Sequence, residues 1–382
     1  MTEVLYENIL QIQWQQVVMW IIGGILIYLA IKKEMEPTLL LPMGFGAILV
    51  NLPNSGAITQ TITDALGNVL HSEEGVIDIL FGMGIANELF PLLLFVGIGA
   101  MIDFGPLLAN PRLMLFGAAA QFGIFFTFSM ARLVGFGIYD AASIGIIGAA
   151  DGPTSIFIAN TLNSNYLAAI MVAAYSYMAL VPIVQPPFIK LVTTKAERRI
   201  KMPYANSEVS KATKILFPII ITIIVGLIAP KSVALIGFLM FGNLIRECGV
   251  LDNLSETAQK VLANLITLFL GISIASKMRA DIFLTPDTLL ILGLGLVAFI
   301  FDTIGGVMFA KLLNLFLKNK INPMIGAAGI SAFPMSARVV HKMGLEEDSS
   351  NFLLMHSIGA NVSGQVASVI AGGLILGFVQ NM

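Results

Sequence analysis

The sequence predicts an all-α polytopic membrane protein made of two inverted-topology repeats with broken, re-entrant helices. Of its 382 residues, 57% are hydrophobic and only 12% are charged, and the mean hydropathy is +0.88. These values are typical of integral membrane proteins. Two apolar segments are interrupted by proline at corresponding places in the two halves, and the most basic stretch lies between the halves. We therefore place the first repeat at residues 1–200, with a basic linker beginning at residue 190, and the second repeat at residues 201–382.

The distribution of charge predicts the orientation of the chain in the membrane. The expected membrane segments of the first half are residues 17–31, 39–52, 89–102, 113–136, 141–158 and 166–189. The connection formed by residues 53–88 contains no Lys or Arg, which places it outside the cytoplasm, because cytoplasmic loops carry the excess of positive charge. The linker at 190–214 carries seven Lys and Arg residues and is expected to be cytoplasmic. The N-terminus is then expected to lie outside.

Short motifs recur in the same order in both halves. The pair GF occurs at 44–45 and 237–238, FVGI at 95–98 matches FLGI at 269–272, and IGAA occurs at 147–150 and 325–328. With a cytoplasmic linker, the first span of one half crosses the membrane in the direction opposite to the first span of the other half. The repeat is therefore inverted. The broken segments at 141–158 and 323–338 would enter the membrane from opposite sides. Paired interrupted segments of this kind are typical of the binding sites of transporters.

Asp151 lies at the break of the first interrupted segment, within the sequence IGAADGPTSI. Glycine and proline interrupt a helix, and a carboxylate at membrane depth is costly and usually functional. A break also exposes backbone carbonyls at helix ends that carry partial charge. Hydroxyl oxygens near the two breaks could come from Thr154, Ser155, Ser331 and Ser336. A site made only of oxygen ligands suits an alkali or alkaline-earth cation. The alternative is that Asp151 only caps a half-helix.

Further candidates lie on the segments that follow the breaks. Tyr175 and Tyr177 are two residues apart and therefore point to different helix faces, so that at most one faces the site. The hydroxyl of that tyrosine could exchange a proton as a cation arrives or leaves, and the other tyrosine would belong to an interfacial aromatic belt. Asp103 and Asp302 are further intramembrane carboxylates with either a functional or a structural role. The final segment, 351–378, carries Asn361, Ser363, Gly364 and Ser368.

Four stretches of the chain are specific in combination: residues 97–111, GAADGPT at 148–154, AYSYMALVP at 174–182 and NVSG at 361–364. Together they resemble the β subunit of the sodium-pumping biotin-dependent decarboxylases. That family includes the membrane subunits of oxaloacetate, methylmalonyl-CoA, glutaconyl-CoA and malonate decarboxylases. The resemblance runs from Pro37 to Gly377.

The resemblance implies a membrane subunit of a sodium pump. A carboxyltransferase α subunit would transfer a carboxyl group to biotin on a biotin carrier subunit, and a small single-span membrane subunit would complete the assembly. Carboxybiotin would then lose carbon dioxide at the present subunit, consuming a proton while Na+ leaves the cytoplasm. The fold would resemble elevator-type sodium–carboxylate symporters, as a homotrimer in the bacterial inner membrane.

The resemblance also implies roles for individual residues. Asp151 would bind Na+ and Tyr177 would exchange the proton. Asn361, Gly364 and Ser368 would line a second Na+ site. Combined with the oxygens expected near the breaks, the candidate Na+ ligands are Asp151, Thr154, Ser155, Ser331, Asn361, Ser363, Gly364 and Ser368. Arg338 and Lys342 are the basic residues available to hold carboxybiotin.

Two other classes of function compete with the pump. A secondary sodium–carboxylate transporter of similar fold would use Arg338 to hold a substrate anion. A structural membrane anchor for a soluble complex would not need Asp151. The sequence has no Met-Lys-Met biotin attachment site, so biotin would be carried by a partner. Nucleic acid is not an expected partner, because no basic stripe with interleaved aromatic residues is present.

Overall fold

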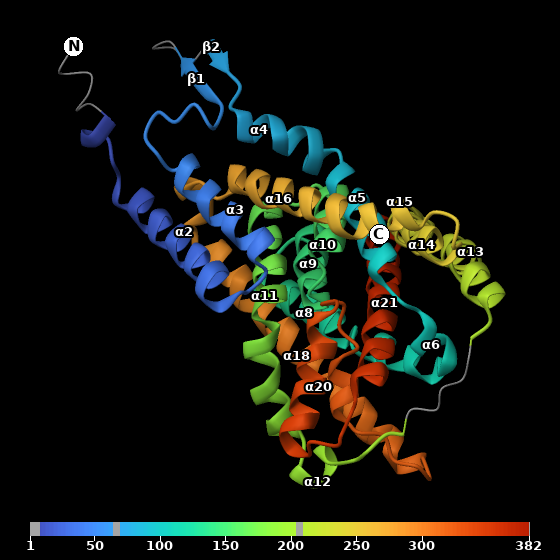
Figure 1. The fold of residues 1–382 in the computed structure, drawn as a ribbon. Helices are drawn as coiled ribbons and strands as arrows, with labels where there is room; N and C mark the ends of the chain where they lie inside the picture. The colour runs from blue at the N-terminus through green and yellow to red at the C-terminus, as the bar shows by residue number, and fades with distance from the viewer. Residues whose placement is uncertain (1–7, 64–68, 204–208, 382) are drawn as a thin grey trace. The chain divides into compact units, whose positions relative to one another are not determined.

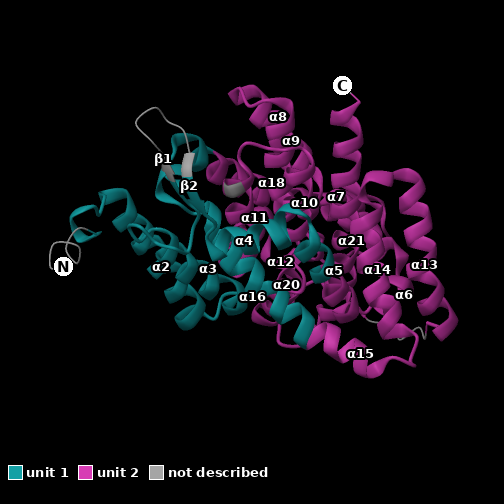
Figure 2. Cartoon of the chain, turned by 90° about the horizontal axis from the view of Figure 1, so that it is seen from above, with its two compact units in different colours: residues 1–94, 261–290 teal, residues 95–260, 291–382 magenta. Residues whose placement is uncertain are grey.

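The computed structural model describes residues 8–63, 69–203 and 209–381 (Figure 1). The chain forms two compact units (Figure 2): unit 1 contains residues 1–94 and 261–290, and unit 2 contains residues 95–260 and 291–382. Each unit therefore draws on both halves of the sequence.

Seven helical stretches among the described residues are long and apolar enough to cross a membrane. They are Trp14–Lys33, Pro111–Val134, Ala169–Val192, Lys211–Ile228, Asp252–Lys277, Pro286–Phe316 and Leu354–Gln380. An eighth span is present if Val76–Ala86 and Leu89–Met101, which meet at a bend of 61°, count as one. The chain is thus a polytopic, mostly α-helical membrane protein, as predicted.

The described part of unit 1 contains three longer helices, several short helical segments and one pair of strands. Its helices are α2 (Trp14–Lys33), α3 (Pro37–Val50), α4 (Val76–Phe81), the π-helical turn Gly82–Ala86, α16 (Ala263–Ile274), the 3-10 turn Ala275–Lys277 and α17 (Ala280–Phe283). Strands β1 (Gln60–Thr63) and β2 (Val69–Glu73) pair in antiparallel fashion. The expected connection at 53–88 is therefore partly ordered as a hairpin and a helix, and the described chain is not purely helical.

Helix α3 packs between α2 and α16 through small residues. A Cβ atom at Gly44 would lie 2.6 Å from the carbonyl oxygen of Gly23, and one at Gly271 would lie 2.7 Å from a carbonyl oxygen of α3. Asn51, which is buried at the end of α3, donates to the carbonyl of Met278 at 2.8 Å. Close backbone approach between small residues, together with a buried side-chain hydrogen bond, is typical of helix packing in membranes.

Unit 2 contains most of the helices. Helices α5 (Leu89–Met101) and α18 (Pro286–Phe316) begin in unit 1 and continue into unit 2. The other helices of unit 2 are α6 (Gly105–Ala109), α7 (Met114–Ala119), α8 (Phe122–Val134), α9 (Ile138–Gly145), α10 (Gly152–Thr161), α11 (Leu167–Val192), α12 (Lys195–Arg198), α13 (Lys211–Ile228), α14 (Val233–Glu247), α15 (Asp252–Glu256), α19 (Met324–Ala327), α20 (Met335–Glu347) and α21 (Leu354–Gln380). Short 3-10 turns lie at Pro111–Leu113, Ile146–Ala149 and Pro230–Ser232, and the π-helical segment Thr257–Leu262 follows α15.

Helix α21, red in Figure 1, is the most enclosed of the long helices in unit 2. It packs against α6, α7, α10 and α20. Gly364 permits a close approach between backbones, because a Cβ atom there would collide with the carbonyl oxygen of Gly329. Helix α21 therefore lies directly against the second interrupted segment.

Both interrupted segments are broken where the sequence predicts. The first consists of α9, the 3-10 turn Ile146–Ala149, a left-handed Ala150 (φ 50°) and α10. The second consists of α19, a non-helical stretch at 328–334 and α20. The span expected at 113–136 is present as the stretch Pro111–Val134, with a short turn between α7 and α8.

Candidate functional site

The first break is organised around Asp151, which is the N-cap of α10 and is only 3% exposed. Its Oδ1 accepts the backbone N–H of Thr154 at 3.3 Å, and its Oδ2 accepts the Thr154 hydroxyl at 2.8 Å. The Ser155 hydroxyl donates to the Asp151 carbonyl at 2.8 Å. These are the contacts of an N-cap. In this segment the cap is a charged group inside a membrane protein, where a neutral cap would cost less to bury.

The second break touches the first through Ser331. Its backbone N–H donates to the carbonyl of Ala149, immediately before the first break, at 3.1 Å. Its hydroxyl donates to the carbonyl of Gly364 on α21 at 3.1 Å. The two interrupted segments and α21 therefore meet at Ser331, one of the residues predicted from the sequence.

Helix α21 presents a stripe of polar side chains to both breaks. Asn361, Gln365 and Ser368 follow one another at spacings of four and three residues and lie on one helix face. Ser368 donates to Asp151 Oδ2 at 3.0 Å. The amide nitrogen of Gln365 donates to the carbonyl of Ser331, and that of Asn361 donates to the carbonyl of Ile330 at 2.6 Å. Gln365 was not predicted from the sequence, although its spacing from Asn361 and Ser368 indicates the shared face.

Three oxygens near the breaks are buried and have no hydrogen-bond partner among the described residues. They are Oδ1 of Asn361, Oε1 of Gln365 and the hydroxyl of Tyr175. Buried polar atoms are nearly always paired, so each of these unpaired oxygens is a candidate contact for a ligand. Carboxylate, amide and hydroxyl oxygens are ligands for hard cations. The arrangement is therefore suited to binding a small cation.

The two tyrosines of α11 point in different directions, as their spacing predicts. The ring of Tyr175 packs against Gly152, next to Asp151, so closely that a Cβ atom at Gly152 would overlap it. Tyr177 instead donates its hydroxyl to the carbonyl of Leu292 on α18. In this structure Tyr175 is the tyrosine that contacts the first break.

Two predicted hydroxyls are already paired with groups other than Asp151 and Ser331. Ser363 donates to the carbonyls of Leu113 at 3.0 Å and Ala360 at 2.7 Å, so it faces the start of α7. Ser336 donates to the carbonyl of Ala327 at 2.9 Å and to Oε1 of Gln185 at 3.1 Å. Ser336 thus joins the two ends of the second break, while Ser363 lies on a different side of α21 from the polar stripe.

The other two carboxylates have structural partners. Asp103 accepts the N–H of Gly105 at 2.8 Å and lies 3.7 Å from Nζ of Lys214, with 41% of its side chain exposed. Asp302 is fully buried and accepts the N–H of Gly123 in the first turn of α8. It satisfies a donor at the start of α8, and the second carboxylate oxygen of Asp302 has no partner among the described residues.

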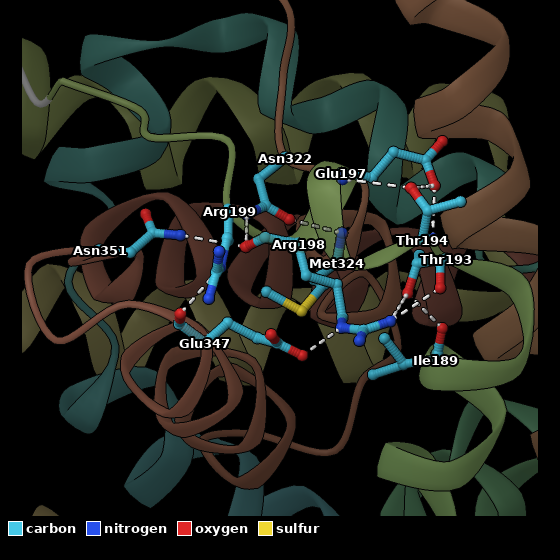
Figure 3. A network of polar contacts seen from close by, with 10 residues as sticks. All are labelled: Ile189, Thr193, Thr194, Glu197, Arg198, Arg199, Asn322, Met324, Glu347 and Asn351. Atoms are coloured by element: carbon cyan, nitrogen blue, oxygen red, sulfur yellow. Dashed lines mark hydrogen bonds and ion pairs between the residues drawn. The ribbon is translucent and has the colours of Figure 1, made fainter.

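The basic linker is tied to α20 and to the chain before the second break (Figure 3). Nε of Arg198 lies 2.6 Å from Oε1 of Glu347, and this hydrogen bond holds the pKa of Glu347 below its usual range. Asn322 and Asn351 donate to the carbonyl of Arg198 at 2.8 and 3.1 Å. Lys201 adds an ion pair of 3.1 Å with Asp348. The linker therefore contacts the chain that precedes the second break and the end of the helix that follows it.

The two basic residues predicted to hold carboxybiotin share a surface. Arg338 and Lys342 are exposed and lie four residues apart on α20, which places them on the same helix face. The same helix begins at the second break and ends in the linker network.

Comparison with known proteins identifies the family. The family described as the Na+-transporting oxaloacetate decarboxylase beta subunit matches residues 15–379. The chain belongs to this family. The probable oxaloacetate decarboxylase beta chain of Vibrio cholerae is 44% identical over 97% of each chain. The glutaconyl-CoA decarboxylase subunit beta of Acidaminococcus fermentans is 48% identical over 96% of this chain and 94% of that protein.

A further relative supports the same family. The methylmalonyl-CoA decarboxylase subunit beta of Propionigenium modestum is 48% identical over 94% of each chain. These β subunits belong to sodium-pumping decarboxylases that depend on biotin and act as complexes of several subunits. The resemblance seen in the sequence is thereby confirmed. The family supports the membrane subunit of a sodium-translocating decarboxylase and not the secondary transporter.

Proposed function

We propose that this chain decarboxylates carboxybiotin and uses the reaction to export Na+ through the site around Asp151. A carboxyltransferase α subunit and a biotin carrier subunit would deliver the carboxyl group, and a small single-span membrane subunit would complete the assembly. The observation that carries the proposal is a buried carboxylate at a helix break, contacted by Ser368 of α21, in a chain of this family. A capping residue alone would not need a charge at this depth.

The chemistry at the subunit is a decarboxylation that needs one proton. The bond between the carboxyl carbon and the biotin ureido nitrogen breaks, carbon dioxide leaves, and the nitrogen takes up a proton. Arg338 and Lys342, exposed on one face of α20, would attract the carboxylate of carboxybiotin. Tyr177 would exchange the proton, which requires its hydroxyl to leave the carbonyl of Leu292 during the cycle.

The proposed cation ligands are drawn from both breaks and from α21. Asp151 supplies the charge, and neutral oxygens would come from Thr154, Ser155, Ser331, Asn361 and Ser368, with Gly364 contributing its carbonyl. Asp151 and Asn361 contact different breaks, which fits two neighbouring ion positions. Ser363 is left out of this set because its hydroxyl bonds the carbonyls of Leu113 and Ala360.

The proposed architecture is a pair of inverted repeats, residues 1–200 and 201–382, in an elevator-type arrangement. Supporting this, each repeat contains one broken segment, and each compact unit combines chain from both repeats. The linker would face the cytoplasm and the N-terminus the outside of a bacterial inner membrane. A homotrimer of this chain would provide the fixed scaffold.

The proposal is tested by measuring carbon dioxide release from carboxybiotin by the purified complex, with and without Na+. We expect release that Na+ stimulates. No release, together with Na+-dependent uptake of a carboxylate into vesicles, would instead indicate a secondary transporter. Because the carboxyltransferase partner selects the acyl substrate, carboxybiotin itself is the appropriate substrate for this test.

A further inference from the structure

We propose that the side-chain oxygen of Gln365 is a Na+ ligand that joins the Asp151 end of the site to the Asn361 end. This inference rests on the proposed function, since it adds one ligand to the same cation site. It gives Gln365 a role in ion affinity and selectivity beyond that of holding the fold.

The position of Gln365 on α21 is the first support. Asn361 and Ser368 lie on either side of it on one helix face. Asn361 contacts the second break at Ile330, and Ser368 contacts Asp151 in the first break. Gln365 is the side chain between these two contacts, where an ion shared by both breaks would lie.

The direction of the amide is the second support. The Gln365 nitrogen donates to the carbonyl of Ser331, which can only accept, so the amide oxygen must point away from Ser331. That oxygen is buried and has no partner among the described residues. Asn361 repeats the arrangement, with its nitrogen on the carbonyl of Ile330 and its oxygen unpaired. Two neighbouring amides therefore use their nitrogens to bind the second break and leave two oxygens free to coordinate a cation.

An unpaired amide oxygen does not by itself define an ion site. Gln121 also has a buried, unpaired Oε1 and donates its nitrogen to the carbonyl of Gly117. It lines an apolar pocket beside Phe122 and Phe125, and no carboxylate is among the residues that line this pocket. Gln365 differs because a Ser–Asp contact and a second free amide oxygen lie within one helical turn of it. Gln121 is therefore a matched control.

The competing role for Gln365 is a clamp that only holds Ser331, and two substitutions separate the roles. Gln365→Met removes both the donor and the oxygen. Gln365→Glu removes the donor to Ser331 but keeps oxygens for a cation. For a ligand, we expect Gln365→Met to raise the Na+ concentration for half-maximal decarboxylation about tenfold, with Gln365→Glu close to or below wild type. If both variants raise it equally, the oxygen is not a ligand and the proposal is overturned.

The assays use the intact complex with carboxybiotin, and Gln121→Met should leave the Na+ response unchanged. If Gln365→Met does not assemble, Gln365→Glu decides through selectivity. An anionic ligand in place of a neutral one should change the ratio of Na+ to Li+ affinity, whereas an unchanged ratio would overturn the proposal. Asp151→Asn separates the two levels of inference. If that variant keeps a normal Na+ response, the proposed site itself fails. If it loses the response while Gln365→Met keeps it, only the Gln365 assignment fails.

Discussion

The first break and the second break expose backbone in the same way but satisfy it differently. Asp151 finds most of its partners three and four residues along the chain, in Thr154 and Ser155, and adds one contact from Ser368 of α21. The second break carries no charge, and its carbonyls at Ile330 and Ser331 are bound by α21 side chains 31 and 34 residues away. The first break therefore holds its shape locally, while the second depends on the position of α21. An ion that binds between them would couple the two.

Removing the charge of the first break should have the largest effect. Asp151→Asn keeps a good N-cap, so α10 should persist, but it removes the negative charge that balances a cation. We expect Na+-dependent carbon dioxide release to fall at least about 100-fold, which corresponds to roughly 3 kcal/mol. The complex should still assemble, as checked by gel filtration. Near-normal turnover of Asp151→Asn would show that the charge of the first break is not needed, and that the two breaks do not differ in this respect.

Tyr177→Phe should block turnover but spare Na+ binding. The substitution removes the hydroxyl proposed to exchange the proton and leaves the ring packed in its apolar cluster. Turnover and equilibrium Na+ binding are to be measured on the same preparation. Loss of Na+ binding would mean that the hydroxyl is a ligand and that the proton role is wrong.

Two serines of α21 test which side of the helix belongs to the site. Ser368→Ala removes a hydrogen bond to Asp151, so we expect a several-fold rise in the Na+ concentration for half-maximal activity, equivalent to about 1 kcal/mol. Ser363→Ala makes the same chemical change on the side that faces Leu113, and the Na+ response should not change. If the two substitutions change the Na+ response equally, the two faces of α21 contribute equally and the site is not confined to the Ser368 face.

The linker network should have the smallest effect on transport and a measurable effect on stability. The pKa of Glu347 is lowered by Arg198, so this carboxylate stabilises the fold above its unfolded pKa, and that contribution is lost as the pH falls below about 4.5. Glu347→Gln should lower the free energy of unfolding by roughly 1–2 kcal/mol at pH 7. Thermal unfolding of both proteins between pH 2 and 8 measures this, and the difference should shrink progressively below about pH 4.5. A constant difference across this range would show that the ion pair does not stabilise the fold.

The contrast between the breaks also explains which features could be predicted from the sequence. The Asp-Gly-Pro break contains its own capping residues, so Asp151, Thr154 and Ser155 could be assigned from spacing. Ser336 contacts Gln185 and Gln365 contacts Ser331, and these partners are distant in sequence. Local pattern could therefore place Ser336 near the break and Gln365 on the polar face of α21, but could not predict their contacts. Apolar runs located the spans but did not predict the turn between α7 and α8, after which Gly123 donates to Asp302, 179 residues away. The β1–β2 hairpin was not predicted, because only the charge of residues 53–88 was considered.

Equilibrium binding of radioactive Na+ to the purified chain in lipid nanodiscs tests most directly whether the paired breaks form a cation site. We expect saturable binding to the wild-type chain and to Ser363→Ala, and none to Asp151→Asn at the same Na+ concentrations. Saturable binding of equal affinity to Asp151→Asn would contradict a site built on the first break.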